Sequence, residues 1–65
     1  MLFTDEKGKE YIVDTETIMT GTHDKVLFSK RITPIDRERK LSEKDRELIV
    51  SKILNLTKDI RWLIQ

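Results

Sequence analysis

The stretch LSEKDRELIVSKILNLTKDIRWLIQ, residues 41–65, decides the fold class because its apolar residues follow the period of an amphipathic helix. It contains no Gly or Pro, and Ser42 stands at an N-cap position ahead of the acidic residues Glu43 and Asp45. The apolar positions fill roughly half of the helix circumference. They are Ile49, Val50, Ile53, Leu54, Leu56, Ile60, Leu63 and Ile64. We therefore expect one helix over residues 42–64.

The residues before this helix predict β-strands, because β-branched and aromatic residues are frequent there and apolar and polar residues alternate. The candidate strands are residues 2–4, 10–13, 16–20 and 25–32. Gly8 fits a short hairpin loop between the first two strands, and Pro34 ends the last one. The sequence thus predicts an α+β fold, in which a small N-terminal antiparallel sheet of three to four strands is followed by one C-terminal amphipathic helix.

This organisation predicts a single domain over residues 1–65. Its parts are a β-sheet region (1–33), a connecting segment (34–41) and the helix (42–64).

Composition excludes several classes of protein. The 65 residues include 13 Lys and Arg, 12 Asp and Glu, one His and no Cys. A chain without cysteine has no disulfide and no thiolate metal site, and one histidine cannot build a zinc site alone. No apolar run approaches the roughly 20 residues that a membrane span needs. We therefore expect a cytoplasmic protein with no cofactor, no metal and no membrane segment.

The small size of the chain favours association with another molecule. A chain of about 60 residues buries only roughly 60% of its unfolded surface, so its core is marginal. With Ile53 and Ile60 at heptad position a, Leu56 and Leu63 fall at d, which is typical of a parallel two-stranded coiled coil. The same stripe also fits a helix that simply covers the sheet. We expect either a homodimer or docking on a larger protein.

Trp62 lies near the polar side of the predicted helix, where it is either an interface anchor or a cap on the rim of the core. We expect partner recognition to use Trp62 and the helix rather than the turns at Gly8 and His23. The predicted interface residues are Ile49, Ile53, Leu56, Ile60, Trp62 and Leu63.

A basic middle segment, residues 30–46, supports an alternative function as a dimeric nucleic-acid-binding regulator. Its candidate phosphate contacts are Lys30, Arg31, Arg37, Arg39 and Lys40. Acidic residues alternate with these basic ones, and the overall pI of about 8.0 is below that of a dedicated nucleic-acid binder. We rank this alternative below binding to a protein.

The sequence offers no arrangement for catalysis. His23 stands in a turn without a convincing nucleophile, and the isolated Gly8 and Gly21 form no phosphate-binding loop. We therefore expect a small non-enzymatic interaction protein, a regulator or inhibitor that binds a larger protein. Small regulators encoded by phages and bacteria have this profile of size and charge.

Overall fold

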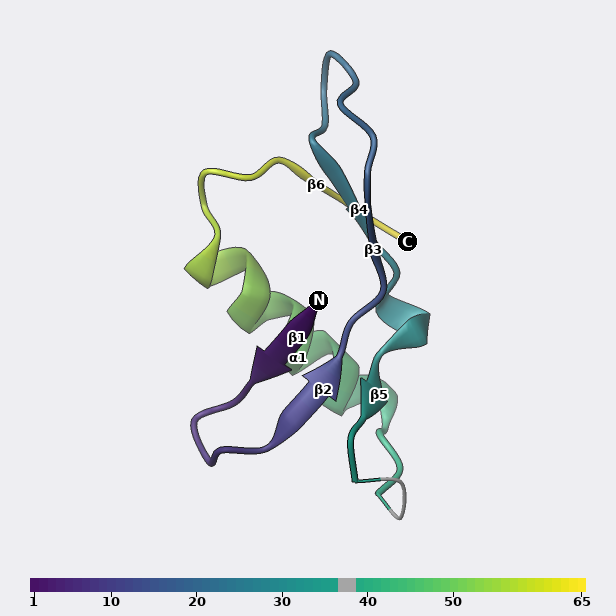
Figure 1. The fold of residues 1–65 in the computed structure, drawn as a ribbon, viewed down its shortest axis with the longest axis vertical. Coiled ribbons are helices and arrows are strands. Elements are labelled where there is room, and N and C mark those ends of the chain that lie inside the picture. The colour runs from purple at the N-terminus through teal and green to yellow at the C-terminus, as the bar shows by residue number, and fades with distance from the viewer. Residues whose placement is uncertain (37–38) are drawn as a thin grey trace.

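The computed structural model of the chain describes residues 1–36 and 39–65 (Figure 1). Over these residues the chain forms six short strands in two three-stranded sheets, one 3-10 turn and one α-helix. In chain order they are β1 (Leu2–Thr4), β2 (Glu10–Ile12), β3 (Thr15–Thr17), β4 (Lys25–Leu27), η1 (Ser29–Arg31), β5 (Thr33–Pro34), α1 (Glu43–Leu56) and β6 (Trp62–Ile64). The predicted α+β class with a single C-terminal helix is confirmed.

The first sheet has the order β1-β2-β5 and is antiparallel throughout. Leu2 pairs with Ile12 and Phe3 with Tyr11. Because side chains alternate across a strand, Phe3 points into the core while Leu2 stays on the outer face. Gly8 closes the β1–β2 turn with a φ of 80°, a conformation that glycine adopts without strain.

The second sheet has the order β3-β4-β6, and β6 runs parallel to β4. The expectation of one antiparallel N-terminal sheet is therefore wrong in this detail, because the C-terminal strand completes a second, mixed sheet. The central strand explains why. Val26 and Leu27 of β4 are 5% and 0% exposed, and a buried strand needs hydrogen-bonding partners on both sides.

The helix begins where the sequence predicts. The Ser42 hydroxyl accepts a hydrogen bond from the Asp45 N–H at 3.1 Å, and the Asp45 carboxylate accepts one from the Ser42 N–H at 3.1 Å. This reciprocal pair is a capping box. The expected C-terminal boundary at residue 64 is wrong, because the helix ends at Leu56 and residues 62–64 pair with β4 instead.

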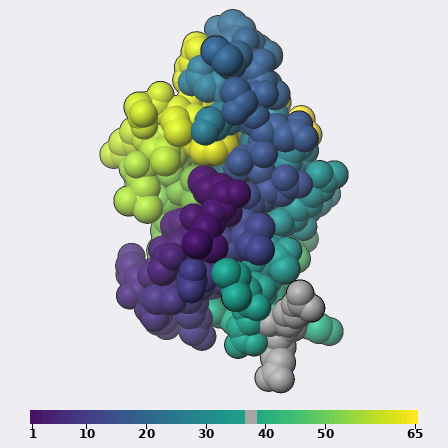
Figure 2. All heavy atoms as spheres, viewed as in Figure 1, coloured from purple at the N-terminus to yellow at the C-terminus, as the bar shows by residue number. Residues whose placement is uncertain are grey.

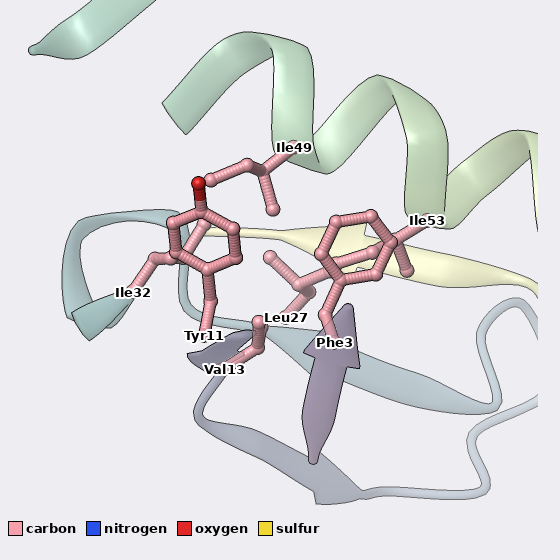
Figure 3. Packing of buried hydrophobic residues seen from close by; sticks show 7 residues of the cluster. All are labelled: Phe3, Tyr11, Val13, Leu27, Ile32, Ile49 and Ile53. Atoms are coloured by element: carbon pink, nitrogen blue, oxygen red, sulfur yellow. The ribbon is translucent and has the colours of Figure 1, made fainter. Parts of the chain in front are cut away.

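The core lies between the helix and the two sheets (Figure 3). It consists of Phe3, Tyr11, Val13, Leu27, Ile32, Ile49 and Ile53. Ile49 and Ile53 are four residues apart, so they lie on the same face of α1 and point toward the strands.

Candidate functional site

Two of the predicted interface residues lie in the core. Ile49 and Ile53 are only 6% and 2% exposed. A partner helix would reach them only by displacing the sheets. The part of the predicted stripe that contains Ile49 and Ile53 thus covers the protein's own strands, and the helix ends at Leu56, before Ile60 and Leu63.

The other four predicted interface residues are spread over the helix end, the following turn and β6. Ile60 and Leu63 are half-buried. Trp62 packs against the core cluster, and its Nε1 donates a hydrogen bond to the Thr57 hydroxyl at 2.9 Å. Leu56 is 76% exposed, so it has the largest free surface of the six predicted residues.

The predicted phosphate-binding residues differ in whether their side chains already have partners within the chain. Arg31 pairs with Asp14 at 3.0 Å and lies over the Phe28 ring. The Arg39 Nη1 donates to the Tyr11 hydroxyl at 2.8 Å, so this guanidinium also has a partner within the chain.

Two of the remaining three residues lie in the part of the chain that the structure describes. Lys30 and Lys40 are exposed, and Arg37 lies outside the described residues. No contact among residues 1–36 and 39–65 joins the basic side chains into one surface.

The free edge of β1 is an open hydrogen-bonding site. Among the described strands, β1 pairs only with β2. The Val13 N–H donates to the Met1 carbonyl at 2.8 Å, and the Asp5 N–H donates to the Lys9 carbonyl at 2.9 Å. Hydrogen-bonded and free positions alternate along an antiparallel pair. The N–H and C=O groups of Leu2 and Thr4 therefore point away from β2, toward solvent.

Two other sheet edges carry features that discourage strand pairing. In β5, Pro34 lies opposite Tyr11, while the next N–H, of Ile35, bonds to Glu10. The proline ring therefore occupies the outward position, where no N–H is available to another strand. The β3 edge consists of Thr15, Glu16 and Thr17, which are polar or charged. Residues 2–4 of β1 have neither proline nor charge.

A groove of about 230 Å³ lies beside the free edge of β1. The strand side is formed by Phe3, Thr4, Asp5 and Glu6, and the helix side by Lys52, Asn55 and Leu56. In Figure 1 the helix passes behind β1, and its C-terminal turn extends past the free edge of the strand. Leu56 thus offers an exposed apolar side chain at the inner side of this edge.

The outer side of the same edge is also apolar. Leu2 and Ile12 are cross-strand neighbours and are 58% and 54% exposed. Figure 2 shows β1 and β2 side by side on this uncovered face of the sheet. A strand added to β1 would therefore meet apolar side chains on both of its faces.

Asp5 fixes the turn at the end of the groove. Its Oδ1 accepts hydrogen bonds from the Lys7 and Lys9 N–H groups, both at 2.9 Å, and its Oδ2 accepts one from the Tyr11 hydroxyl at 3.1 Å. Desolvation alone would raise the pKa of Asp5, but the hydrogen bonds from Lys9, Tyr11 and Lys7 outweigh it and lower this pKa. The carboxylate is therefore ionised at neutral pH.

The Tyr11 hydroxyl connects this turn to the segment before the helix, through its bonds to Asp5 and Arg39. Burial, followed by the hydrogen bond to Asp5, raises the pKa of Tyr11. Nearby, the Lys52 Nζ lies 3.6 Å from a Glu6 carboxylate oxygen, which links the helix to the same turn. These contacts hold the β1–β2 hairpin and the helix in a fixed arrangement around the groove.

The described residues offer no arrangement of side chains for metal chemistry. Residues 1–36 and 39–65 contain no group of three or more His, Cys, Asp or Glu side chains that could hold an ion. His23 lies in the β3–β4 turn, where its Nδ1 is 2.9 Å from the Thr22 hydroxyl. Within the same residues, no helix has the length and apolar character to span a membrane.

The β1 edge is not among the sites predicted from the sequence. The signal was the contrast between residues 2–4, which lack proline and charge, and the proline at the other edge of the sheet. Interpreting it requires the strand order, which the pattern alone does not give. The chain matches no protein-family model, no curated protein and no solved structure.

Proposed function

We propose that this chain is a small non-enzymatic interaction protein, a regulator or inhibitor, which binds an extended segment of a larger protein along β1. The observation that supports this proposal is the open edge of β1, which has an exposed apolar side chain on either side: Leu2 on the outer face and Leu56 in the groove. Natural proteins usually protect such edges, because unpaired N–H and C=O groups recruit other strands.

Strand addition explains how so small a surface could bind. Main-chain hydrogen bonds to Leu2 and Thr4 would supply affinity, and alternate side chains of the segment would supply specificity. One set of side chains would lie on the outer face beside Leu2, and the other set would lie on the inner face beside Leu56. The groove also contains the carboxylates of Asp5 and Glu6 against one lysine, so it favours a segment with Lys or Arg beside its apolar residues.

A single extended segment fits this edge better than a second copy of the sheet. An antiparallel β1–β1 pair would have its two-fold axis beside β1, and the helix passes behind this strand and extends past its free edge (Figure 1). The two helices would then meet on the same side of the paired sheets. The predicted homodimer stays a prediction, and two residues of the helix stripe on which it was based, Ile49 and Ile53, lie in the core.

Capture of a partner by variants of the edge tests the proposal. Tagged protein is incubated with lysate of the source cells, and bound proteins are identified by mass spectrometry. Thr4→Pro removes an outward N–H from β1 and should abolish capture. Thr17→Pro is the matched control: the Ile18 N–H donates to the Asp24 carbonyl, so the Thr17 N–H also points away from its neighbouring strand. It should leave capture intact.

The groove is tested in the same way. Leu56→Glu should prevent capture, and Leu54→Glu, which changes another exposed leucine of α1, should not. Bound protein should persist when the salt concentration of the wash is raised, whereas nucleic acid would be released. Equal capture by Thr4→Pro and Thr17→Pro, with both variants folded, would overturn the proposed site. Recovery of nucleic acid alone would favour the alternative function.

A further inference from the structure

We propose that the tip of the β3–β4 hairpin, residues 18–24, is a second contact surface, on which Met19 is an anchor for an apolar pocket of the same larger protein. This inference rests on the proposed function and adds a separate site to it. It departs from the expectation that the turn at His23 takes no part in recognition. In Figures 1 and 2 the hairpin projects from one end of the molecule, away from the helix and the first sheet. The molecule measures 39 × 19 × 18 Å, so this projection lies along a pronounced long axis.

Met19 occupies the tip in an unfavourable backbone conformation. Its φ is 46°, the left-handed region, and its side chain is 80% exposed. A residue with a Cβ atom in this region is under strain, and such strain persists only where surrounding contacts enforce it. Packing does not enforce it here, because Met19, Thr20, Gly21 and Thr22 are all exposed.

Hydrogen bonds enforce the conformation instead. The N–H groups of Ile18 and Met19 both donate to the Asp24 carbonyl, at 3.0 and 3.2 Å. The Thr20 hydroxyl accepts from the His23 N–H at 2.9 Å, and the Thr20 N–H donates to the His23 carbonyl at 2.9 Å. The turn is therefore closed by contacts on both sides of its apex.

Arg61 then fixes this turn to the rest of the molecule. Its Nη2 donates to the Asp24 Oδ1 at 2.9 Å, and its Nη1 donates to the Gly21 carbonyl at 3.3 Å. The Asp24 N–H donates to the Arg61 carbonyl at 2.8 Å. Ordering a loop has an entropic cost, and residues 18–24 contribute no side chain to the core that would offset it. The order of the tip would favour binding, because a preorganised loop loses little conformational entropy on association.

The chemistry of the tip indicates the kind of pocket that it fits. Met19 has an unbranched, polarisable side chain, which adapts to irregular apolar cavities. Its neighbours Ile18 and Thr20 are uncharged, and the charges of Asp24 and Arg61 neutralise each other. The tip therefore presents the Met19 side chain between two uncharged neighbours, and it fits an apolar pocket of a protein.

Three variants test whether Met19 is the anchor. Met19→Gly removes the side chain and relieves the strain, so it should keep or raise the melting temperature while weakening binding by about thirtyfold, as truncation of a binding hot spot does. Met19→Leu keeps an apolar side chain and should bind within a few fold of the wild type. Ile35→Ala removes another exposed apolar side chain, 50% exposed, and should bind as the wild type does.

Arg61→Ala tests the support. This variant retains the Met19 side chain, but it should lower the amide order parameters of residues 18–24 toward the flexible range, below about 0.6. Partner affinity should fall with them.

The outcomes distinguish the two proposals. Loss of binding in Met19→Gly but not in Thr4→Pro would keep the tip and overturn the β1 site. The reverse pattern would overturn the tip and keep the β1 site. Failure of the wild type to capture any protein would overturn both. Low order parameters at residues 18–24 in the wild type would overturn the tip proposal without any partner, because the tip would not be preorganised.

Discussion

The Asp24 carboxylate accepts hydrogen bonds from both the backbone N–H and the guanidinium of Arg61. The Arg61 N–H donates to Oδ2 at 2.9 Å, and the Nη2 donates to Oδ1 at 2.9 Å. One side chain thus ties the β3–β4 turn to the residue that precedes β6. The side-chain hydrogen bond from Arg61, followed by the bond from its backbone, lowers the pKa of Asp24.

This pair predicts how stability depends on pH. A carboxyl group whose folded pKa is lowered contributes stability that is present above its ordinary pKa of 3.8 and is lost as pH falls through the folded value. Asn does not titrate, so the Asp24→Asn variant should lose less stability than the wild type when the pH falls from about 5 to about 2. Urea unfolding across this pH range measures the difference. Glu16→Gln, an exposed change on β3, is the control and should follow the wild type.

Tyr11→Phe should destabilise the fold, because it removes a hydroxyl that donates to Asp5 and accepts from Arg39. Tyr11 is 2% exposed, and hydrogen bonds to charged partners contribute about 1.5–3 kcal/mol. Denaturant unfolding measures the loss. An NMR titration of the same variant should show a higher pKa for Asp5, because one of the hydrogen bonds that lower it is gone. A stable variant with an unchanged pKa would contradict this network.

The two faces of α1 should respond differently to truncation. Ile53→Ala creates a cavity in the core and should cost about 2–5 kcal/mol of the free energy of unfolding. Leu56→Ala changes a side chain that is 76% exposed and should stay within about 0.5 kcal/mol. Unfolding followed by circular dichroism compares them. Equal losses would show that Leu56 is packed and that the groove beside β1 is closed.

Proline variants in β6 distinguish a strand from a continued helix. Arg61 and Gln65 form hydrogen bonds with β4, and in a parallel pair such positions alternate, so Leu63 bonds to β4 and Ile64 does not. Leu63→Pro should therefore cost about 1–3 kcal/mol more than Ile64→Pro. If residues 57–64 continued the helix, both prolines would break it to a similar extent. Thermal unfolding of the two variants decides between these arrangements.

The start of the helix was predictable from the sequence, and its end was not. Ser42 and Asp45 form a local signal, because a capping box depends on residues three positions apart. The end depends on a competition between distant segments. Residues 60–64 suit a helix face as well as a strand, and the buried β4 decides the outcome by requiring a partner.

The candidate surfaces were also not predictable from the sequence, because they depend on contacts between distant segments. Leu56 was predicted as an interface residue from its place on an apolar stripe, but its exposure depends on where the helix crosses β1. Met19 lay in a predicted strand, and its positive φ arises from hydrogen bonds to residues on the other side of the turn. Periodicity describes one element at a time, whereas both surfaces are made by pairs of elements.

The parallel pairing of β6 with β4 also sets an order of events in folding. The β1–β2 and β3–β4 hairpins join neighbouring residues and can form early, whereas Lys25 meets Trp62 only after a long loop has closed. Until that closure, Val26 and Leu27 have an unpaired, apolar edge. We therefore expect the refolding yield to fall as protein concentration rises, because this edge stays open to other chains until the loop closes.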